Sequence, residues 1–253
     1  MTRRRPGTAA FAALTGALLL LGATACTGGG SDDGSGGDDA LPIEVVSQPD
    51  HEGEPISLDL PVHSSGAFEF DQWPSACDLV DQETMQAVLP GATEVAQEAE
   101  PMELTLLGIG TDPEDTHTVP EARCSMSAGF DADGLRLEDG NVVMNVIVEV
   151  HQAGDAEFVE RNHQQPGGEQ VEIGDATCTP QDRMAYTCAM ENISFSVMID
   201  ARPYAQYTDA DASVYSVDGE EVDYSEDTDA FLTMSQEKIL RPMVEIAVQR
   251  LSA

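Results

Sequence analysis

The cysteines constrain the fold of this chain more than any other feature. Five are present in 253 residues, and four of them, Cys77, Cys124, Cys178 and Cys188, lie beyond residue 70. None of them forms the Cys-x-x-Cys pair that is typical of a zinc site. An even set in an exported chain predicts two disulfides. Four cysteines allow three connectivities, and proximity in the sequence favours Cys77–Cys124 and Cys178–Cys188.

Residues 1–25 have the three parts of a bacterial export signal. Three arginines at positions 3–5 precede an apolar run from Ala9 to Leu21, and small residues then lead to Cys26. The 17 residues from 9 to 25 are fewer than the roughly 20 that span a membrane. A cysteine at this position resembles a lipoprotein signal, in which the cysteine is acylated, with palmitate among its lipids, and becomes the new N-terminus. We therefore expect a lipid anchor on Cys26, at the outer face of the cytoplasmic membrane. Both Sec and twin-arginine export remain open.

The acidic composition restricts the partners. The formal net charge is −36. Without residues 1–25, 8 basic residues face 47 acidic ones and the net charge is −39. Such a charge repels nucleic acid and anionic membrane surfaces. We therefore expect no nucleic-acid partner, and membrane attachment by the lipid anchor alone. Adaptation to a salty medium, an acidic tether and cation binding are competing explanations of the charge.

Composition divides the chain into three parts. Residues 1–25 are the signal peptide. Residues 26–70 comprise the lipidated cysteine and a chain rich in Gly, Ser and Asp, which we expect to be a flexible tether because it has little apolar surface to bury. Residues 71–253 have the length of one domain.

Local patterns predict helices and strands in this domain. A helix over 81–89 has Asp81 as its N-cap, and a second helix starts at Asp155. Alternating residues predict strands over 124–130 and 142–150. The clearest signal is a hairpin of 183–190 and 193–200. Its register places Cys188 opposite Phe195 and Tyr186 opposite Val197, so that apolar side chains share one face.

The last fifty residues predict a loop and a helix. The stretch 203–228 is acidic and has no Lys or Arg, which is typical of a long loop. A helix starts at Asp227 or Thr228, and Pro242 should break or kink it. The predicted fold is therefore α+β, an antiparallel sheet packed with a few helices and held by two disulfides.

The opening Cys77-Asp78-Leu79-Val80, the second cysteine before a Val-rich strand and the cysteine pair in a hairpin resemble a known group. It is the actinobacterial lipoprotein family classed as a domain of unknown function, whose domain opens with Asp-Pro-Cys-x-Leu-Leu. The chain is more distantly similar to the extracellular sensor domains of mycobacterial serine/threonine kinases. The resemblance implies an antiparallel α+β domain and brings no activity or catalytic residue.

No motif assigns a catalytic site. The histidines are scattered along the chain, at positions 51, 63, 117, 151 and 163, and the Gly-x-Ser-x-Gly pattern of serine hydrolases is missing from the sequence. Asp131-Ala132-Asp133-Gly134 begins like a calcium loop, but the twelfth position is Val142 where the loop needs Glu, so a hairpin turn is the better interpretation. We expect no catalytic residue, no metal ligands and no cofactor.

These observations favour a non-catalytic, accessory or sensor-like domain that binds an envelope protein or a small ligand. Two alternatives remain. An envelope hydrolase with a dispersed site would require a buried carboxylate or His with a shifted pKa in a cleft. A calcium- or salt-dependent structural module would use the acidic loops.

Overall fold

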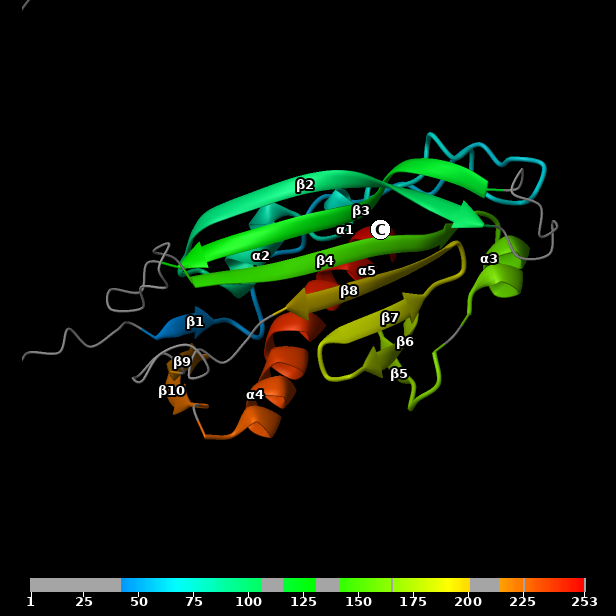
Figure 1. Cartoon of the computed structure of the whole chain (residues 1–253). Helices are drawn as coiled ribbons and strands as arrows, with labels where there is room; N and C mark the ends of the chain where they lie inside the picture. Colours follow the sequence, from blue (N-terminus) through cyan, green and yellow to red (C-terminus); the bar gives the residue numbers. More distant parts are fainter. Residues whose placement is uncertain are drawn as a thin grey trace, which may run out of the picture. The chain divides into compact units, whose positions relative to one another are not determined.

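The computed structural model describes residues 42–105, 116–130, 142–164, 166–200, 214–224 and 226–252 (Figure 1). Several sequence predictions lie outside these residues. They are the signal peptide, the lipidated Cys26, the tether up to residue 41, the turn at Asp131–Gly134 and residues 203–213 of the acidic loop. Within the described ranges, no helix has both the length and the apolar character needed to cross a membrane.

The fold is α+β, as predicted, and its largest part is a seven-stranded antiparallel sheet (Figure 1). Its strand order is β2-β3-β4-β8-β7-β6-β5. The strands are β2 (Ala92–Thr105), β3 (Thr116–Phe130), β4 (Val142–Ala153), β5 (Val171–Ile173), β6 (Ala176–Gln181), β7 (Ala185–Ala189) and β8 (Ile193–Asp200). Sequence reasoning missed β2. This edge strand carries exposed glutamates at 94, 98 and 103, which hide the apolar alternation and suit an unpaired edge.

The predicted hairpin is confirmed as β7 and β8. Cys188 pairs with Phe195 and Tyr186 pairs with Val197, and all four side chains are buried. The Met190 N–H donates to the Ile193 carbonyl oxygen at the turn. The apolar faces of both strands therefore point into the same core.

Both expected disulfides are confirmed. Cys77–Cys124 joins α1 (Ala76–Leu79) to β3, with 5.0 Å between the Cα atoms. Cys178–Cys188 joins neighbouring strands β6 and β7, with 4.0 Å between the Cα atoms. Each links elements that are already adjacent in the fold.

Aspartate side chains start the remaining helices, as predicted. Asp81 accepts a hydrogen bond from the Thr84 N–H, and Asp155 accepts one from the Phe158 N–H. These two residues cap α2 (Gln82–Val88) and α3 (Ala156–Asn162). Asp227 caps α4 (Thr228–Met234) in the same way.

The C-terminal helix is long and bent, and the bend lies where Pro242 was expected to disturb it. α4 continues as a π-helical segment, η3 (Ser235–Leu240), and then as α5 (Arg241–Ser252). Proline has no N–H to donate to the preceding turn. The wider turn just before it, in which the Arg241 N–H donates to the Gln236 carbonyl oxygen, lets the helix continue.

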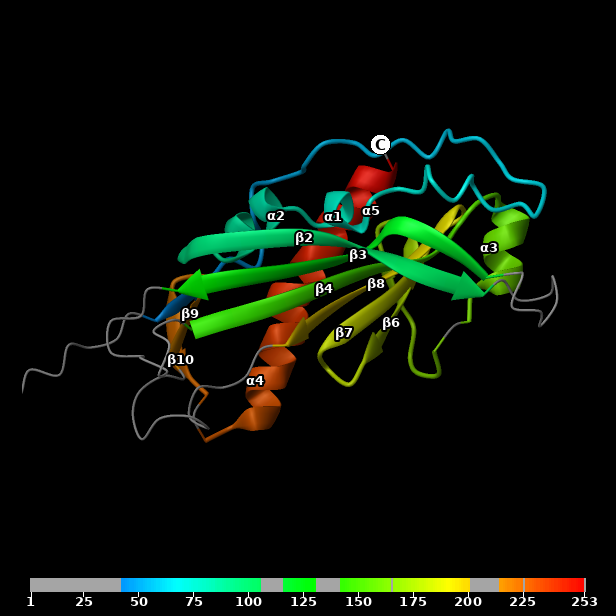
Figure 2. The same cartoon turned by 45° about the horizontal axis from the view of Figure 1, so that its top comes forward.

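The folded unit begins earlier than the expected boundary at residue 71. β1 (Ile43–Val45) pairs in parallel with β9 (Val214–Val217), which also pairs with β10 (Glu220–Asp223). Ile43 and Val45 are buried. The chain after β1 passes the end of α5 (Figure 2), where the Ile56 N–H donates to the Arg250 carbonyl oxygen. Residues 42–70 are thus not a free tether, because most of their apolar side chains are buried or pack against the core, although Val62 is exposed. The hairpin β9–β10 likewise corrects the prediction of a continuous loop over 203–228.

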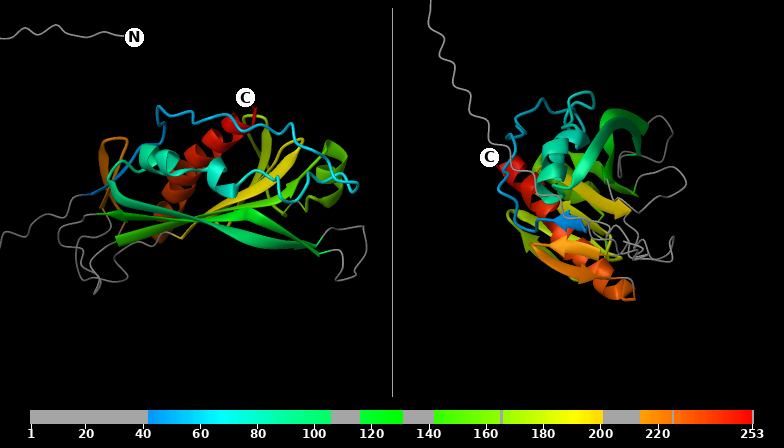
Figure 3. Two further views of the ribbon diagram at one scale, coloured as in Figure 1. Left: turned by 90° about the horizontal axis from the view of Figure 1, so that it is seen from above. Right: turned by 90° about the vertical axis from the view of Figure 1, so that its left-hand side faces the viewer.

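The two faces of the large sheet differ. Helices α1, α2 and α5 lie on one face (Figure 3). On that side β4 presents fully buried apolar residues, Met144, Val146, Val148 and Val150. The opposite face of β4 carries Glu149 and His151, and it forms the floor of a polar pocket.

Candidate functional site

A polar pocket lies on the sheet face away from the helices. Its volume is about 450 Å³. Strands β4, β6, β7 and β8 supply the floor, and the chain that leaves α3 supplies one wall, including His163 and Pro166. The pocket therefore brings together residues 149–152 of β4, 194–198 of β8, single residues of β6 and β7 and the end of α3. None of these segments carries a recognisable sequence motif.

A β-bulge in β4 shapes the floor. Val150 pairs with Phe195, but the next partner of β8, Ser194, pairs with Gln152, so that His151 is an extra residue in β4. A bulge of this kind turns side chains out of strict alternation. As a result, consecutive residues His151 and Gln152 both line the pocket.

His151 and Ser196 lie side by side in the pocket. The His151 Nε2 and Ser196 Oγ atoms are 2.9 Å apart, within hydrogen-bonding distance. Burial lowers the pKa of His151 below its usual value near 6.5, and the carboxylate of Glu149 offsets only part of this shift. The pKa of His163 is also lowered, first by burial and then by the nearby His151. Both rings are therefore neutral at pH 7.

Three buried oxygen atoms in the pocket lack a hydrogen-bond partner among the described residues. They are Gln152 Oε1, Asn162 Oδ1 and Ser194 Oγ. The Asn162 Nδ2 donates to the Phe158 carbonyl oxygen at 2.8 Å, which fixes the amide so that its oxygen stays free to accept. Asn162 is 2% exposed and Ser194 is fully buried. These three atoms have almost no accessible surface, so a molecule in the pocket does not reach them unless the side chains that cover them move.

The pocket has little net charge of its own. Among the residues that the structure describes, no Lys or Arg lines it, and Glu149 is its one carboxylate. That carboxylate is already paired, because Arg123 Nη1 lies 2.7 Å from Glu149 Oε1. The site can thus offer hydrogen bonds but no free charge.

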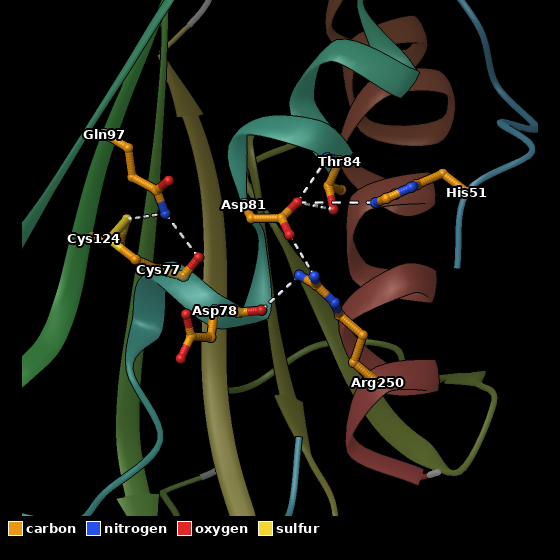
Figure 4. Close-up of polar contacts among 8 residues, drawn as sticks. All are labelled: His51, Cys77, Asp78, Asp81, Thr84, Gln97, Cys124 and Arg250. Atoms are coloured by element: carbon orange, nitrogen blue, oxygen red, sulfur yellow. Dashed lines mark hydrogen bonds and ion pairs between the residues drawn. A yellow bond between two sulfur atoms is a disulfide. The ribbon is translucent and has the colours of Figure 1, made fainter. Parts of the chain in front are cut away.

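A second polar cluster joins the C-terminal helix to α1 and α2 (Figure 4). The guanidinium of Arg250 is 5% exposed and donates to Asp81 Oδ2 and to the Asp78 carbonyl oxygen. Burial raises the pKa of Asp81, but the hydrogen bonds from Thr84 and Arg250 outweigh it, and the net shift is downward. The guanidinium and the carboxylate are paired with each other, although Arg250 Nε and His51 Nε2 have no hydrogen-bond partner among the described residues, and the cluster holds the fold together.

The other histidines take structural positions. His51 Nε2 lies 3.9 Å from Asp81 Oδ1, at the edge of this cluster. The rings of His63 and His117 flank Phe70, with His117 stacked on Phe70 at 4.0 Å between ring centroids. These contacts attach the chain before α1 to the start of β3.

A second hollow, of about 520 Å³, lies between the β9–β10 hairpin and the C-terminal helix. Its lining includes Val217, Val222, Tyr224 and Met234. Lys238 Nζ approaches Asp218 Oδ2 at 3.6 Å beside it. Because Met234 lines this second hollow and not the polar pocket, a change in its environment reports binding at the second hollow.

Sequence reasoning found His151 and His163 only among the scattered histidines and assigned neither to a site, whereas the structure places both in the pocket lining. It missed Gln152, Asn162, Ser194 and Ser196. The alternation Ser194-Phe195-Ser196-Val197 did contain a signal, since the strand with an apolar inner face must present both serines on the other face. Only the pairing of β4 with β8 places them beside His151.

In the described ranges, no three His, Cys, Asp or Glu side chains gather closely enough to hold a metal ion. Comparison with models of known protein families, with curated proteins and with solved structures finds no match to this chain.

Proposed function

We propose that this protein is a lipid-anchored, extracytoplasmic domain that binds a small ligand in the polar pocket without transforming it. The observation that carries the proposal is the pocket itself. Its lining, which includes His151, His163 and Gln164, offers hydrogen-bonding groups and no free charge.

The size and position of the pocket support the proposal. A cavity of about 450 Å³ lies within the range of small-molecule sites, roughly 300–1,000 Å³. Two of the four strands in its floor, β6 and β7, are joined by the Cys178–Cys188 disulfide. The disulfides also suit an oxidising compartment outside the cytoplasm. An anchor at Cys26 would hold the domain at the membrane surface, as the resemblance to actinobacterial lipoproteins implies.

The test uses methionine methyl groups as reporters. Met198 lines the polar pocket and Met234 lines the other hollow. We would label the methionines of the full-length protein with carbon-13, record methyl NMR spectra and add fractions of small molecules extracted from the cell envelope. We expect at least one fraction to shift the Met198 signal saturably and to leave Met234 unchanged.

Two variants check the site. Thr187→Ala removes a half-buried hydroxyl of the pocket lining and should weaken the Met198 response. Ser125→Ala is the control, because Ser125 lies on the same sheet but donates to Glu100 outside the pocket. If no fraction moves Met198, the pocket is not a ligand site.

One observation favours hydrolysis as a second candidate. The His151–Ser196 pair has a neutral base beside a hydroxyl in a pocket, which is the start of a nucleophilic site. Catalytic pairs of this kind also use a third group that orients the histidine. The described residues supply no hydrogen bond to His151 Nδ1, so we place binding first.

Hydrolysis and binding can be separated by turnover. Activated acetyl and butyryl esters would be incubated with the full-length protein and with Ser196→Ala. Hydrolysis that is saturable and lost in Ser196→Ala would favour the enzyme. Ester hydrolysis that is equal in both proteins would remove this candidate.

A further inference from the structure

The β9–β10 hairpin packs on the C-terminal helix and also borders the second hollow. Tyr215 and Tyr224 of the hairpin segment contact Phe231 of α4, with ring centroids 5.6 and 6.2 Å apart. Closer to the turn of the hairpin, Val217 and Glu220, which lie opposite each other in the ladder, line the hollow. Its volume of about 520 Å³ lies within the range of small-molecule sites, roughly 300–1,000 Å³.

The apolar side chains of this hollow can be reached from solvent. Val217 and Val222 of the hairpin and Ala230 of α4 are only half-buried, and all three line the hollow. Their outer surfaces pack against no other part of the core, so an apolar molecule placed there would remove them from water. Such burial is the main favourable contribution to small-molecule binding.

One carboxylate of the lining has no cation beside it. The charged residues of the hollow are Asp218, Glu220, Glu237 and Lys238. Lys238 Nζ lies 3.6 Å from Asp218 Oδ2, and Arg241 Nη1 lies 3.4 Å from Glu237 Oε2. Glu220 is exposed and forms no ion pair with the residues that the structure describes. A ligand in the hollow can therefore supply the cation that Glu220 lacks.

The carboxylate of Glu220 acts on an aromatic side chain of the same hollow. Burial raises the pKa of Tyr224, and the charge of Glu220 raises it further, which places the two groups near each other. Carboxylates and tyrosine rings both attract cations. An anion would be repelled by Glu220 and by the net charge of −36 on the whole chain. The charges of the site thus favour a positive ligand.

We infer that the second hollow is a binding site for a small organic cation with an apolar body. The positive charge pairs with Glu220, and the body packs on Val217 and Val222. Quaternary and protonated amines that carry an aromatic or aliphatic group have this chemistry. The site is separate from the polar pocket, so this inference does not depend on the proposed function.

The test compares four small probes that differ in charge or in apolar body. Benzyltrimethylammonium has both features, benzyl alcohol lacks the charge, tetramethylammonium lacks the aromatic body and benzenesulfonate has the opposite charge. Each would be titrated into the methyl-labelled full-length protein. We expect benzyltrimethylammonium to shift the Met234 signal saturably and to leave Met198 unchanged. Benzyl alcohol and tetramethylammonium should bind at least about threefold more weakly, and benzenesulfonate most weakly of all.

Two variants of neighbouring glutamates separate the site from general attraction to an acidic protein. Glu220→Gln removes the unpaired charge and should weaken binding of benzyltrimethylammonium about two- to fivefold, as expected for an exposed ion pair. It should leave benzyl alcohol unaffected. Glu221→Gln is the matched control, because Glu221 is equally exposed but lies on the opposite face of β10. Both substitutions change the net charge by the same amount.

Three results would overturn the inference. If benzyl alcohol binds as tightly as benzyltrimethylammonium, the hollow does not select cations. If Glu220→Gln and Glu221→Gln weaken binding equally, the cation responds to the overall charge and not to this site. If no probe shifts Met234 saturably, the hollow is not a binding site. Signals from Met198 test the polar pocket separately in the same spectra.

Discussion

Arg250, in the last turns of α5, binds Asp81, the N-cap of α2, although 169 residues separate them in the chain. The same guanidinium donates to the Asp78 carbonyl oxygen at 2.6 Å (Figure 4). One side chain therefore joins the C-terminal helix to the turn between α1 and α2. Because it is 5% exposed, these partners replace the water that would otherwise solvate its charge.

Replacing this arginine should be costly. Arg250→Met leaves Asp81 without its cation, and breaking a buried ion pair costs about 3–5 kcal/mol. Urea unfolding measures the loss. Arg241→Met is the matched control on the same helix, where the arginine is exposed and its pairs with Glu237 and Glu245 should contribute less than about 1 kcal/mol. Equal losses in the two variants would contradict a special role for Arg250.

Gly53 should also tolerate no side chain, because its backbone lies directly against the side chain of Arg250. A Cβ atom there would fall 2.1 Å from Arg250 Nε, and the residue has a φ of +71°. Gly219, with a φ of +86°, has no atom within 4 Å of such a Cβ. Gly219→Ala should therefore show only the conformational cost, about 1 kcal/mol. Gly53→Ala should lose clearly more in the same unfolding measurement, and a smaller loss would show that the extended chain moves aside freely.

The two disulfides should contribute unequally. They close loops of 47 and 10 residues, for which chain entropy predicts about 4 and about 2.7 kcal/mol. Urea unfolding of Cys77→Ala/Cys124→Ala and of Cys178→Ala/Cys188→Ala measures each contribution. We expect the first pair of substitutions to destabilise more. The reverse order would mean that residual structure in the unfolded chain, or packing of β6 on β7, decides the difference.

The neutral histidine in the pocket predicts a pH dependence. His151 has a lowered pKa in the folded state, so the unfolded chain binds a proton more readily near the usual value of 6.5. The stability that its neutral form contributes is complete above pH 6.5 and is lost as the pH falls through the lower folded pKa. Unfolding free energies from pH 8 to pH 5 should decline, and His151→Gln should reduce the decline. An unchanged slope in the variant would assign it to other groups, such as His163.

Sequence reasoning succeeded where a short stretch determines its own structure. Asp81 and Asp155 were recognised as N-caps because a carboxylate at that position pairs with a backbone N–H three residues ahead. The β7–β8 register followed from one apolar face. The fold class and the disulfide pairing followed from such local patterns together.

It failed where distant partners supply the missing information. Residues 42–70 looked like a tether because Ile43 and Val45 have few apolar neighbours in the sequence, yet both are buried beside the distant hairpin β9–β10. The edge strand β2 was hidden by its glutamates. The export signal and Cys26 lie outside the described residues, so the lipid anchor stays a prediction.

The pocket shows most clearly which features follow from local sequence and which depend on distant partners. The sequence by itself determined that β8 has one apolar face, so Ser194 and Ser196 had to lie on the other. Only the tertiary structure decided that the bulge in β4 brings His151 and Gln152 opposite them and that the end of α3 closes the wall. The physical reason is that alternation along a strand is a property of neighbouring residues, whereas the pairing of strands depends on side chains that are far apart in the chain.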